Sequence, residues 1–141
     1  MNYLLDTNIV SEWAKPHPNS GVLSWLDEVD EDGVLISVVT LAELSYGIER
    51  LSAGRRRTHL EAWLREELPE RFEGRVLPIS SVIAQIWGKI IAAREAAGLP
   101  IGAMDAFLAA TARIHGLTIV TRNVSDFEPS MKGILNPWSE G

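Results

Sequence analysis

Six aspartates occur in the 141 residues, and their positions divide them into two groups. Three lie in the acidic segment 27–32, which is typical of a solvent-exposed helix end and loop. The other three, Asp6, Asp105 and Asp126, each lie beside an apolar segment. A carboxylate next to a hydrophobic core needs a partner, because burying an unpaired charge costs free energy. These three aspartates are therefore the first candidates for chemistry.

Glu43 is a fourth candidate acid, because it occupies a similar position relative to a predicted strand. Asp6, Glu43 and Asp126 each follow shortly after an apolar segment that is expected to be a strand. Asp105 precedes such a segment by one helix, so its helix can return it to the same edge of a sheet. Ligands of open α/β sheets bind beyond the carboxyl ends of the strands. Four carboxylates at that edge would repel one another unless they were protonated or bridged by a cation.

The predicted pocket offers oxygen ligands, and its chemistry follows from that. Carboxylates without histidine or cysteine suit Mg²⁺ or Mn²⁺. The chain has no cysteine, which excludes disulfides, zinc–thiolate sites and thiol nucleophiles. Such a metal site lowers the pKa of bound water and stabilises charge on a phosphoryl group. The pattern therefore predicts metal-dependent phosphodiester hydrolysis, with Thr7, Asn8 and Thr121 orienting ligands or waters.

Each acid also has an ordinary structural interpretation. Thr40 to Glu43 matches a capping box, in which the glutamate only reaches back to the cap residue. Asp105 is expected in the first turn of a helix, where the helix dipole favours a carboxylate. Asp126 fits a turn or cap position. Asp6 fits such an interpretation least, because it directly adjoins an apolar strand, and the combined positions rather than any single motif support the metal site.

Strand and helix signals alternate along the chain. β-Branched, apolar segments predict strands at 2–5, 34–38, 75–79, 118–121 and 134–135. Helical periodicity predicts helices at 7–14, 20–29, 40–52, 60–68, 81–98 and 103–115. The segments 40–52 and 60–68 form a helical hairpin that ends at Pro69. This alternation predicts a single α/β domain over residues 1–141, with a central, mainly parallel sheet of four to five strands.

Charge and hydropathy limit the class of protein. The net charge of −6 argues against binding nucleic acid through bulk charge, although a bound metal could supply positive charge locally. The amino terminus lacks a basic stretch followed by an apolar run, and polar residues interrupt the longest apolar segment, near 34–44. We therefore expect a soluble, cytoplasmic protein with no membrane contact. Arg94 and Arg122 are candidate counter-charges for the acids.

Five segments together resemble the PIN-domain family, in its VapC and FitB-like toxin branch. Their order and spacing match over essentially the whole chain, at 4–8 (LLDTN), 37–44 (SVVTLAEL), 103–112 (AMDAFLAATA), 120–127 (VTRNVSDF) and 136–138 (NPW). The resemblance implies a three-layer α/β/α fold and Mg²⁺-dependent endoribonuclease activity, with Mn²⁺ as a possible substitute. It also implies a toxin of a type II toxin–antitoxin system that acts on RNA, forms a homodimer and is neutralised by a VapB-type antitoxin.

The resemblance also assigns roles to single residues. The family's metal ligands fall on Asp6 and Asp105, and Glu43 matches its third acid. The fourth acidic position varies in the family, and this chain offers Asn123 and Asp126 there. We assign Asp126 to the catalytic set with the other three acids, and Asn123 to the residues that orient ligands. Glu43 and Asp126 would help to deprotonate the attacking water, and in-line attack would leave a 5′-phosphate and a 3′-hydroxyl.

Two other functions remain open. A PIN-like module could bind a partner without cutting, although the intact set of Asp6, Glu43 and Asp105 favours an enzyme. A metal-dependent DNA nuclease is also possible, because attack by metal-activated water needs no 2′-hydroxyl. A haloacid-dehalogenase-type phosphatase would need a second aspartate two residues after Asp6, where this chain has Asn8.

Overall fold

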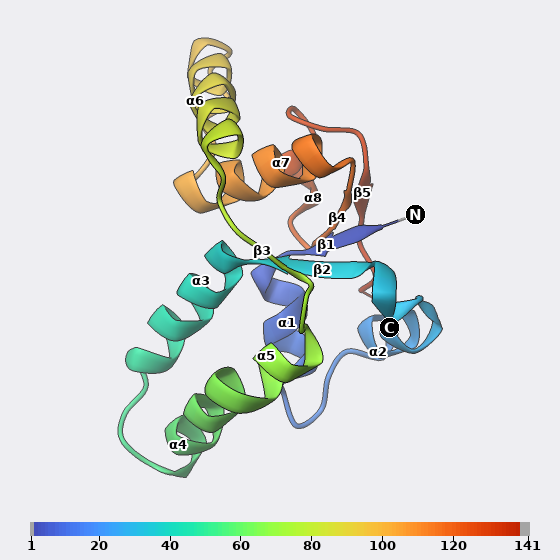
Figure 1. The fold of residues 1–141 in the computed structure, drawn as a ribbon, viewed down its shortest axis with the longest axis vertical. Helices are drawn as coiled ribbons and strands as arrows, with labels where there is room; N and C mark the ends of the chain where they lie inside the picture. Colours follow the sequence, from blue (N-terminus) through green and yellow to red (C-terminus); the bar gives the residue numbers. More distant parts are fainter. Residues whose placement is uncertain (1, 139–141) are drawn as a thin grey trace.

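A five-stranded parallel sheet lies at the centre of the computed structural model, which describes residues 2–138 (Figure 1). The strand order is β3-β2-β1-β4-β5, and every neighbouring pair is parallel. The strands are β1 (Tyr3–Leu5), β2 (Val34–Ser37), β3 (Val76–Leu77), β4 (Thr118–Val120) and β5 (Ile134–Leu135). The predicted α/β fold with a parallel sheet is confirmed, and the direction in which strands are added reverses beside β1.

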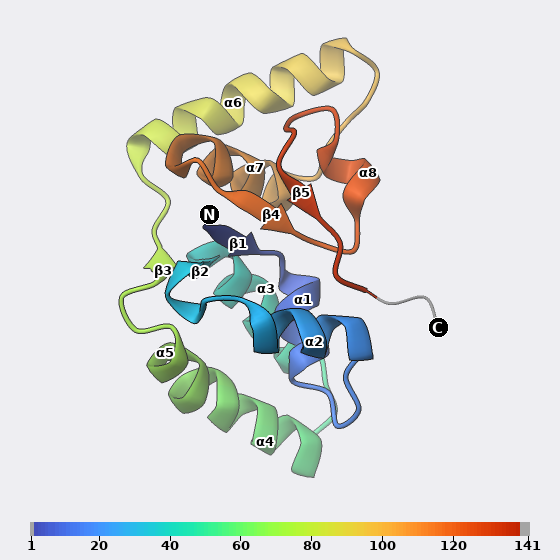
Figure 2. The same cartoon turned by 90° about the vertical axis from the view of Figure 1, so that its right-hand side faces the viewer.

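Helices cover both faces of this sheet, which gives the three-layer α/β/α arrangement (Figure 2). One layer holds α1 (Thr7–Trp13), α2 (Ser20–Glu28), α3 (Val38–Glu49), α4 (Arg55–Ala62) and α5 (Leu68–Arg71). The other layer holds α6 (Ser81–Ala96), α7 (Ala103–His115) and α8 (Val124–Phe127). A 3₁₀ turn, η1 (Glu31–Gly33), precedes β2, and a π-helical turn, η2 (Trp63–Glu67), joins α4 to α5.

Neighbouring residues of the inner strands alternate between two hydrophobic cores. Leu4 and Ile119 belong to the core beneath α6 and α7, whereas Leu5 and Val120 belong to the core beneath α1 and α2. All four side chains are fully buried. Burial on both faces explains why these strands appear in the sequence as continuous apolar runs rather than as alternating ones.

Several helix ends follow directly from local sequence. The side chain of Asn19 accepts hydrogen bonds from the backbone N–H groups of Gly21 and Val22 at the start of α2. Ser80 caps α6 in the same way, and Gly116 ends α7 in the left-handed conformation with a φ of 65°. Glycine tolerates that conformation at no steric cost, which explains why the helix ends there. The predicted boundaries of α7, 103 and 115, are confirmed.

The helix predicted to begin at Thr40 begins instead at Val38. Ser37, the last residue of β2, is its cap, and the Ser37 hydroxyl accepts a hydrogen bond from the Val39 N–H at 3.0 Å. The capping-box interpretation of Thr40 and Glu43 is therefore wrong. Thr40 is buried inside α3, and its hydroxyl has no hydrogen-bond partner in the described part of the chain.

The hairpin also differs from the prediction, because Pro69 does not end its second helix. The helical segment runs from Arg55 to Arg71, with Pro69 as the second residue of α5. Proline fits the first turn of a helix, where its missing N–H is not needed. The π-helical turn before it, Trp63–Glu67, shifts the hydrogen-bond pattern from i→i+4 to i→i+5.

No helix within residues 2–138 is long and apolar enough to cross a membrane.

Candidate active site

Asp6 lies at the carboxyl end of the central strand β1, where it is the cap of α1. Its side chain is buried, with 5% of its surface exposed. Three hydrogen bonds hold the carboxylate. Oδ1 accepts from the Thr7 N–H at 2.7 Å, and Oδ2 accepts from the Thr121 hydroxyl at 2.7 Å and from the Asn8 amide at 3.3 Å. The partners predicted from the sequence, Thr7, Asn8 and Thr121, therefore all contact Asp6.

The same hydrogen bonds tie the loop after β4 to the start of α1. The Asn8 amide also donates to the Thr121 hydroxyl at 3.4 Å, and that hydroxyl accepts from the Asn123 N–H at 3.0 Å. The Arg122 N–H donates to the Asn8 Oδ1 atom at 3.4 Å. Asn123 is exposed and contributes its backbone N–H to this network. The orientation of Asp6 is thus set by residues from both ends of the chain.

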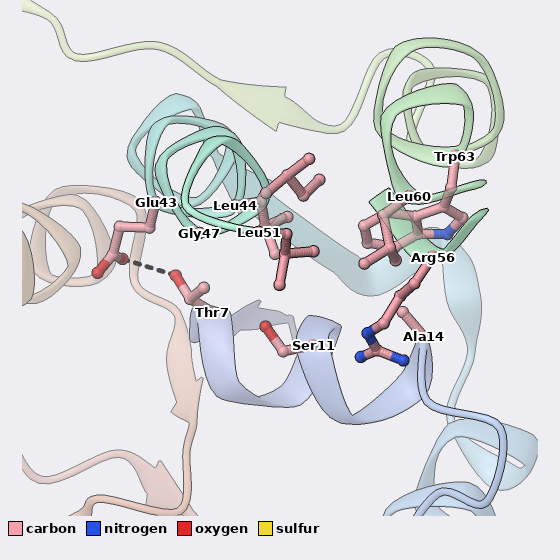
Figure 3. Close-up of a pocket in the computed structure, with 11 residues that line it drawn as sticks. Thr7, Ser11, Ala14, Glu43, Leu44, Gly47, Leu51, Arg56, Leu60 and Trp63 are labelled. Atoms are coloured by element: carbon pink, nitrogen blue, oxygen red, sulfur yellow. Dashed lines mark hydrogen bonds between the residues drawn. The ribbon is translucent and has the colours of Figure 1, made fainter. Parts of the chain in front are cut away.

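Glu43 reaches the site from the second turn of α3. The Thr7 hydroxyl donates to Glu43 Oε1 at 2.6 Å, which joins α1 to α3 (Figure 3). The prediction placed Glu43 in the first turn, but α3 begins two residues earlier than predicted, which puts Glu43 in the second turn. With the capping box excluded, this bond to Thr7 is the contact that orients the Glu43 carboxylate.

Asp105 is partly buried in the first turn of α7, and its electrostatic surroundings include the other three acids. Burial, and to a smaller extent the charges of Asp6, Glu43 and Asp126, raise the pKa of Asp105 to about 6, while the charge of Arg94 opposes them. Burial also raises the pKa of Asp6, against the hydrogen bonds from Thr121 and Thr7. The structure therefore brings the four predicted acids within electrostatic reach of one another.

Three of these acids line one open groove of about 510 Å³. Asp6, Glu43 and Asp105 lie along it, and the other lining residues are Thr7, Asn8, Ser11, Glu12, Lys15, Arg122, Asn123 and Trp138. Asp126 differs from the three, because it is exposed on α8 and does not line the groove. The prediction placed Asp126 in a turn, whereas the structure places it inside a short helix.

The donor set can be tested against the predicted metal. Residues 2–138 contain no group of three or more histidine, cysteine, aspartate or glutamate side chains positioned together to hold a metal ion. Mg²⁺ is commonly held by one or two carboxylates with several retained waters, so a cage of three acids is not required. Asp6 and Asp105 are two carboxyls with raised pKa values in one groove, and none of the described residues lining that groove is a histidine or cysteine, so the donor set fits Mg²⁺.

A second, mostly apolar cavity of about 200 Å³ adjoins this groove between α1, α3 and α4 (Figure 3). It shares Thr7, Ser11 and Glu43 with the groove. The remaining lining is Ala14, Leu44, Gly47, Ile48, Leu51, Arg56, Leu60 and Trp63. A Cβ at Gly47 would meet no atom within 4 Å, so this helix face is open toward the cavity. Glu43 therefore stands at the border between a polar and an apolar space.

Sequence reasoning missed several residues of the groove and could not place others. Ser11 lies one helical turn after Thr7, a spacing that could have identified it. Trp138 belongs to the segment 136–138 that carries the family resemblance, but nothing in the sequence predicts its place in the groove, and Lys15 has no signal of either kind. Of the two predicted counter-charges, Arg122 lines the groove, whereas Arg94 is buried and donates to the carbonyl oxygens of Leu99 and Asp126.

Comparison with known proteins gives consistent matches over nearly all of the chain. Residues 3–128 match the PIN domain. Toxin FitB of Neisseria gonorrhoeae is 36% identical over 137 residues, covering 97% of this chain and 99% of that protein. VapC ribonuclease Y4jK of Sinorhizobium fredii is 37% identical over 135 residues, covering 96% of each. A solved structure of FitAB bound to an IR36 DNA fragment has a TM-score of 0.89 at 34% identity, covering 99% of this chain and 97% of that one.

Proposed function

This chain belongs to the PIN-domain family, in its branch of VapC and FitB ribonuclease toxins, and we propose that it is a Mg²⁺-dependent endoribonuclease. The observation that supports this proposal most strongly is the groove that Asp6, Glu43 and Asp105 share, in which two of the three carboxyls have raised pKa values. Burial is the larger cause of both shifts and repulsion between the acids the smaller one, and a divalent cation would stabilise the ionised carboxylates against both.

Asp6 and Asp105 are the residues that we propose to hold the metal, with Mn²⁺ as a possible substitute. The cation, when bound, would lower the pKa of a water and offset negative charge on the phosphate. Thr121 and Asn8 would keep the Asp6 carboxylate in one orientation, as they do through the bonds of 2.7 and 3.3 Å. Glu43, held by Thr7, would take the proton of the attacking water, with Asp126 as a second acid near the site.

The products follow from this assignment. Water would attack phosphorus in line, and the bond between phosphorus and O3′ would break. The RNA would therefore end in a 3′-hydroxyl on one side of the cut and a 5′-phosphate on the other. A product with a 2′,3′-cyclic phosphate would show that the 2′-hydroxyl attacks instead, and would contradict this mechanism.

The proposed partners come from the family and one feature of the structure. The similar solved assembly is named FitAB, and we propose that this toxin likewise pairs with a small antitoxin of the VapB type. The apolar cavity beside Glu43 offers such a partner a surface next to the acids. A homodimer is part of the same proposal, and light scattering of the purified toxin measures it directly.

The first experiment compares wild type with Asp6→Asn on a mixed set of structured RNAs, in Mg²⁺ and in EDTA. We expect Mg²⁺-dependent cutting by wild type and a loss of at least about 100-fold in the variant, because Asp6 is proposed as a metal ligand and orienting partners alone account for about 10–100-fold. Asp27→Asn is the matched control, because Asp27 is exposed near the end of α2. Equal cutting by wild type and Asp6→Asn would place the chemistry elsewhere.

Two further measurements separate the alternatives. Single-stranded DNA of the same sequences tests the DNA nuclease, which would cut DNA as fast as RNA. Calorimetric titration with Mg²⁺ and Mn²⁺ tests the binding module. A wild type that binds neither cation and cuts no nucleic acid would leave the binding module as the better description.

A further inference from the structure

Two cationic side chains, Lys15 and Arg122, line the groove together with the acids, and they differ in their partners. Lys15 is paired with Glu12, with 2.9 Å between Nζ and Oε1. Arg122 is exposed, and within residues 2–138 no carboxylate lies at ion-pair distance from its guanidinium. Lys15 is therefore largely neutralised by Glu12. The charge of Arg122 also acts on Glu12, but only weakly and without an ion pair between these two side chains, so the guanidinium donors are available to a ligand in the groove.

Arg122 is also held at two points, although its side chain reaches solvent. Its guanidinium lies over the indole ring of Trp138, with 5.4 Å between Cζ and the ring centroid. Its backbone N–H donates to Asn8, whose amide donates to Asp6. The ring contact with Trp138 positions the guanidinium, and the hydrogen bonds through Asn8 fix the Arg122 backbone relative to Asp6.

The chemistry of this pair favours one kind of ligand. The N–H donors of a guanidinium lie in the plane of the group. When its face stacks on an aromatic ring, these donors still point outward and can bind two oxygens of a phosphate. Four acids, Asp6, Glu12, Glu43 and Asp105, line the same groove, in a protein with a net charge of −6. A polyanion that enters this groove needs a cation close to the acids, because the summed field of the protein repels it.

We propose that Arg122, positioned by Trp138, binds a backbone phosphate of the RNA strand next to the phosphate that is cut. This proposal rests on the proposed ribonuclease function and extends it to the binding of the strand. Arg122 contacts the substrate, and Trp138 is a positioning residue. The contact carries no information about base identity, because it is made to phosphate.

Cleavage kinetics with Arg122→Gln provide the first test. We expect the KM for an RNA that wild type cuts to rise about 10-fold, with kcat changed less than about 2-fold, because the lost contact acts on binding. Arg50→Gln is the matched control. Arg50 also lies over an aromatic ring, that of Tyr46 at 5.3 Å, but it follows the last residue of α3 and does not line the groove. We expect its KM to equal that of wild type.

Binding without cleavage provides the second test. A fluorescein-labelled single-stranded oligoribonucleotide of mixed sequence is titrated in EDTA at several salt concentrations. The slope of log K against log salt should fall by about 0.7 in Arg122→Gln, the value for one phosphate contact on a single strand. Trp138→Leu keeps the charge of Arg122 but removes the ring that positions it, so the slope should fall by less than about 0.7. Trp138→Phe should fall less than Trp138→Leu, because an aromatic ring remains, and Arg122→Lys less than Arg122→Gln, because a positive charge remains.

The outcomes separate this proposal from the proposed function. An unchanged KM and salt slope in Arg122→Gln, with wild type cutting RNA, would overturn the phosphate contact and leave the ribonuclease standing. A fall in kcat with KM unchanged would also overturn it, since it would show that Arg122 acts through the geometry of the acids. A wild type that cuts no RNA but binds it with an Arg122-dependent slope would support the contact while the nuclease proposal fails.

Discussion

Asp6 and Asp126 show two ways in which this fold presents an acid to the same site. Asp6 is buried, and three hydrogen bonds to its carboxylate hold it in place. Asp126 is exposed, and its anchor is the backbone, through the bond of 3.0 Å from Arg94 to its carbonyl oxygen. The comparison indicates that the central strands determine where the first acid points, whereas α8 determines only the neighbourhood of the second.

The difference predicts that partners of Asp6 matter more than Asp126 itself. Thr121→Val removes the hydroxyl that donates to Asp6 at 2.7 Å, with little change of shape. We expect cleavage to fall by about 10–100-fold and the affinity for Mg²⁺ to weaken, as for other groups that orient metal ligands. Thr118→Val is the control, because Thr118 lies on β4, the strand that Thr121 directly follows, and does not line the groove. Equal losses in both variants would show that β4 was damaged as a whole.

The comparison can be sharpened by pH, because the pKa of Asp105 is raised from 3.8 to about 6. Between those values the folded protein holds a proton that the unfolded chain has lost. The metal-free protein should therefore lose stability as the pH rises from about 4 to about 6, and change little from this source above that range. Asp6, whose pKa is also raised, acts in the same direction.

Thermal unfolding in EDTA measures this effect. We expect the melting temperature of wild type to fall by several degrees over that range, and that of Asp105→Asn to fall less. Mg²⁺ should raise the melting temperature of wild type at pH 7 and lose this effect below about pH 6, because protons compete for the same carboxyls. Parallel curves for the two proteins in EDTA would contradict the raised pKa of Asp105.

The smallest effect on cleavage is expected from a change at Asp126, the exposed acid of the pair. Asp126→Asn should reduce cleavage less than about 10-fold, since Asp126 lies on α8 outside the groove and acts on it through its charge. The loss should shrink in high salt, which screens exposed charges. Asp32→Asn, at an exposed acid of η1, provides the control for a general change in net charge. A loss as large as that in Thr121→Val would make Asp126 an equal member of the site.

Errors in the sequence prediction occurred where two local signals competed. Thr40 and Glu43 have the pattern of a capping box, but Ser37 three residues earlier is an equally good cap and lies directly at the end of β2. Pro69 reads as a helix stop, but it falls in the first turn of α5, where proline is tolerated. In both cases the local sequence is compatible with either helix boundary. Only the packing of the neighbouring strand or helix determines which boundary forms.

The sequence by itself determined the elements, because their signals are local. The spacing of apolar residues, the capping side chains and the glycine at position 116 each act over a few residues. Together they predict the bounds of α2, α6 and α7 closely. The tertiary structure alone decided which side chains hold each acid in place. The bond between Thr121 and Asp6 spans 115 positions, and that between Thr7 and Glu43 spans 36. Such pairs form because the strand order β2-β1-β4 brings three carboxyl ends to one edge, and no local pattern records that order.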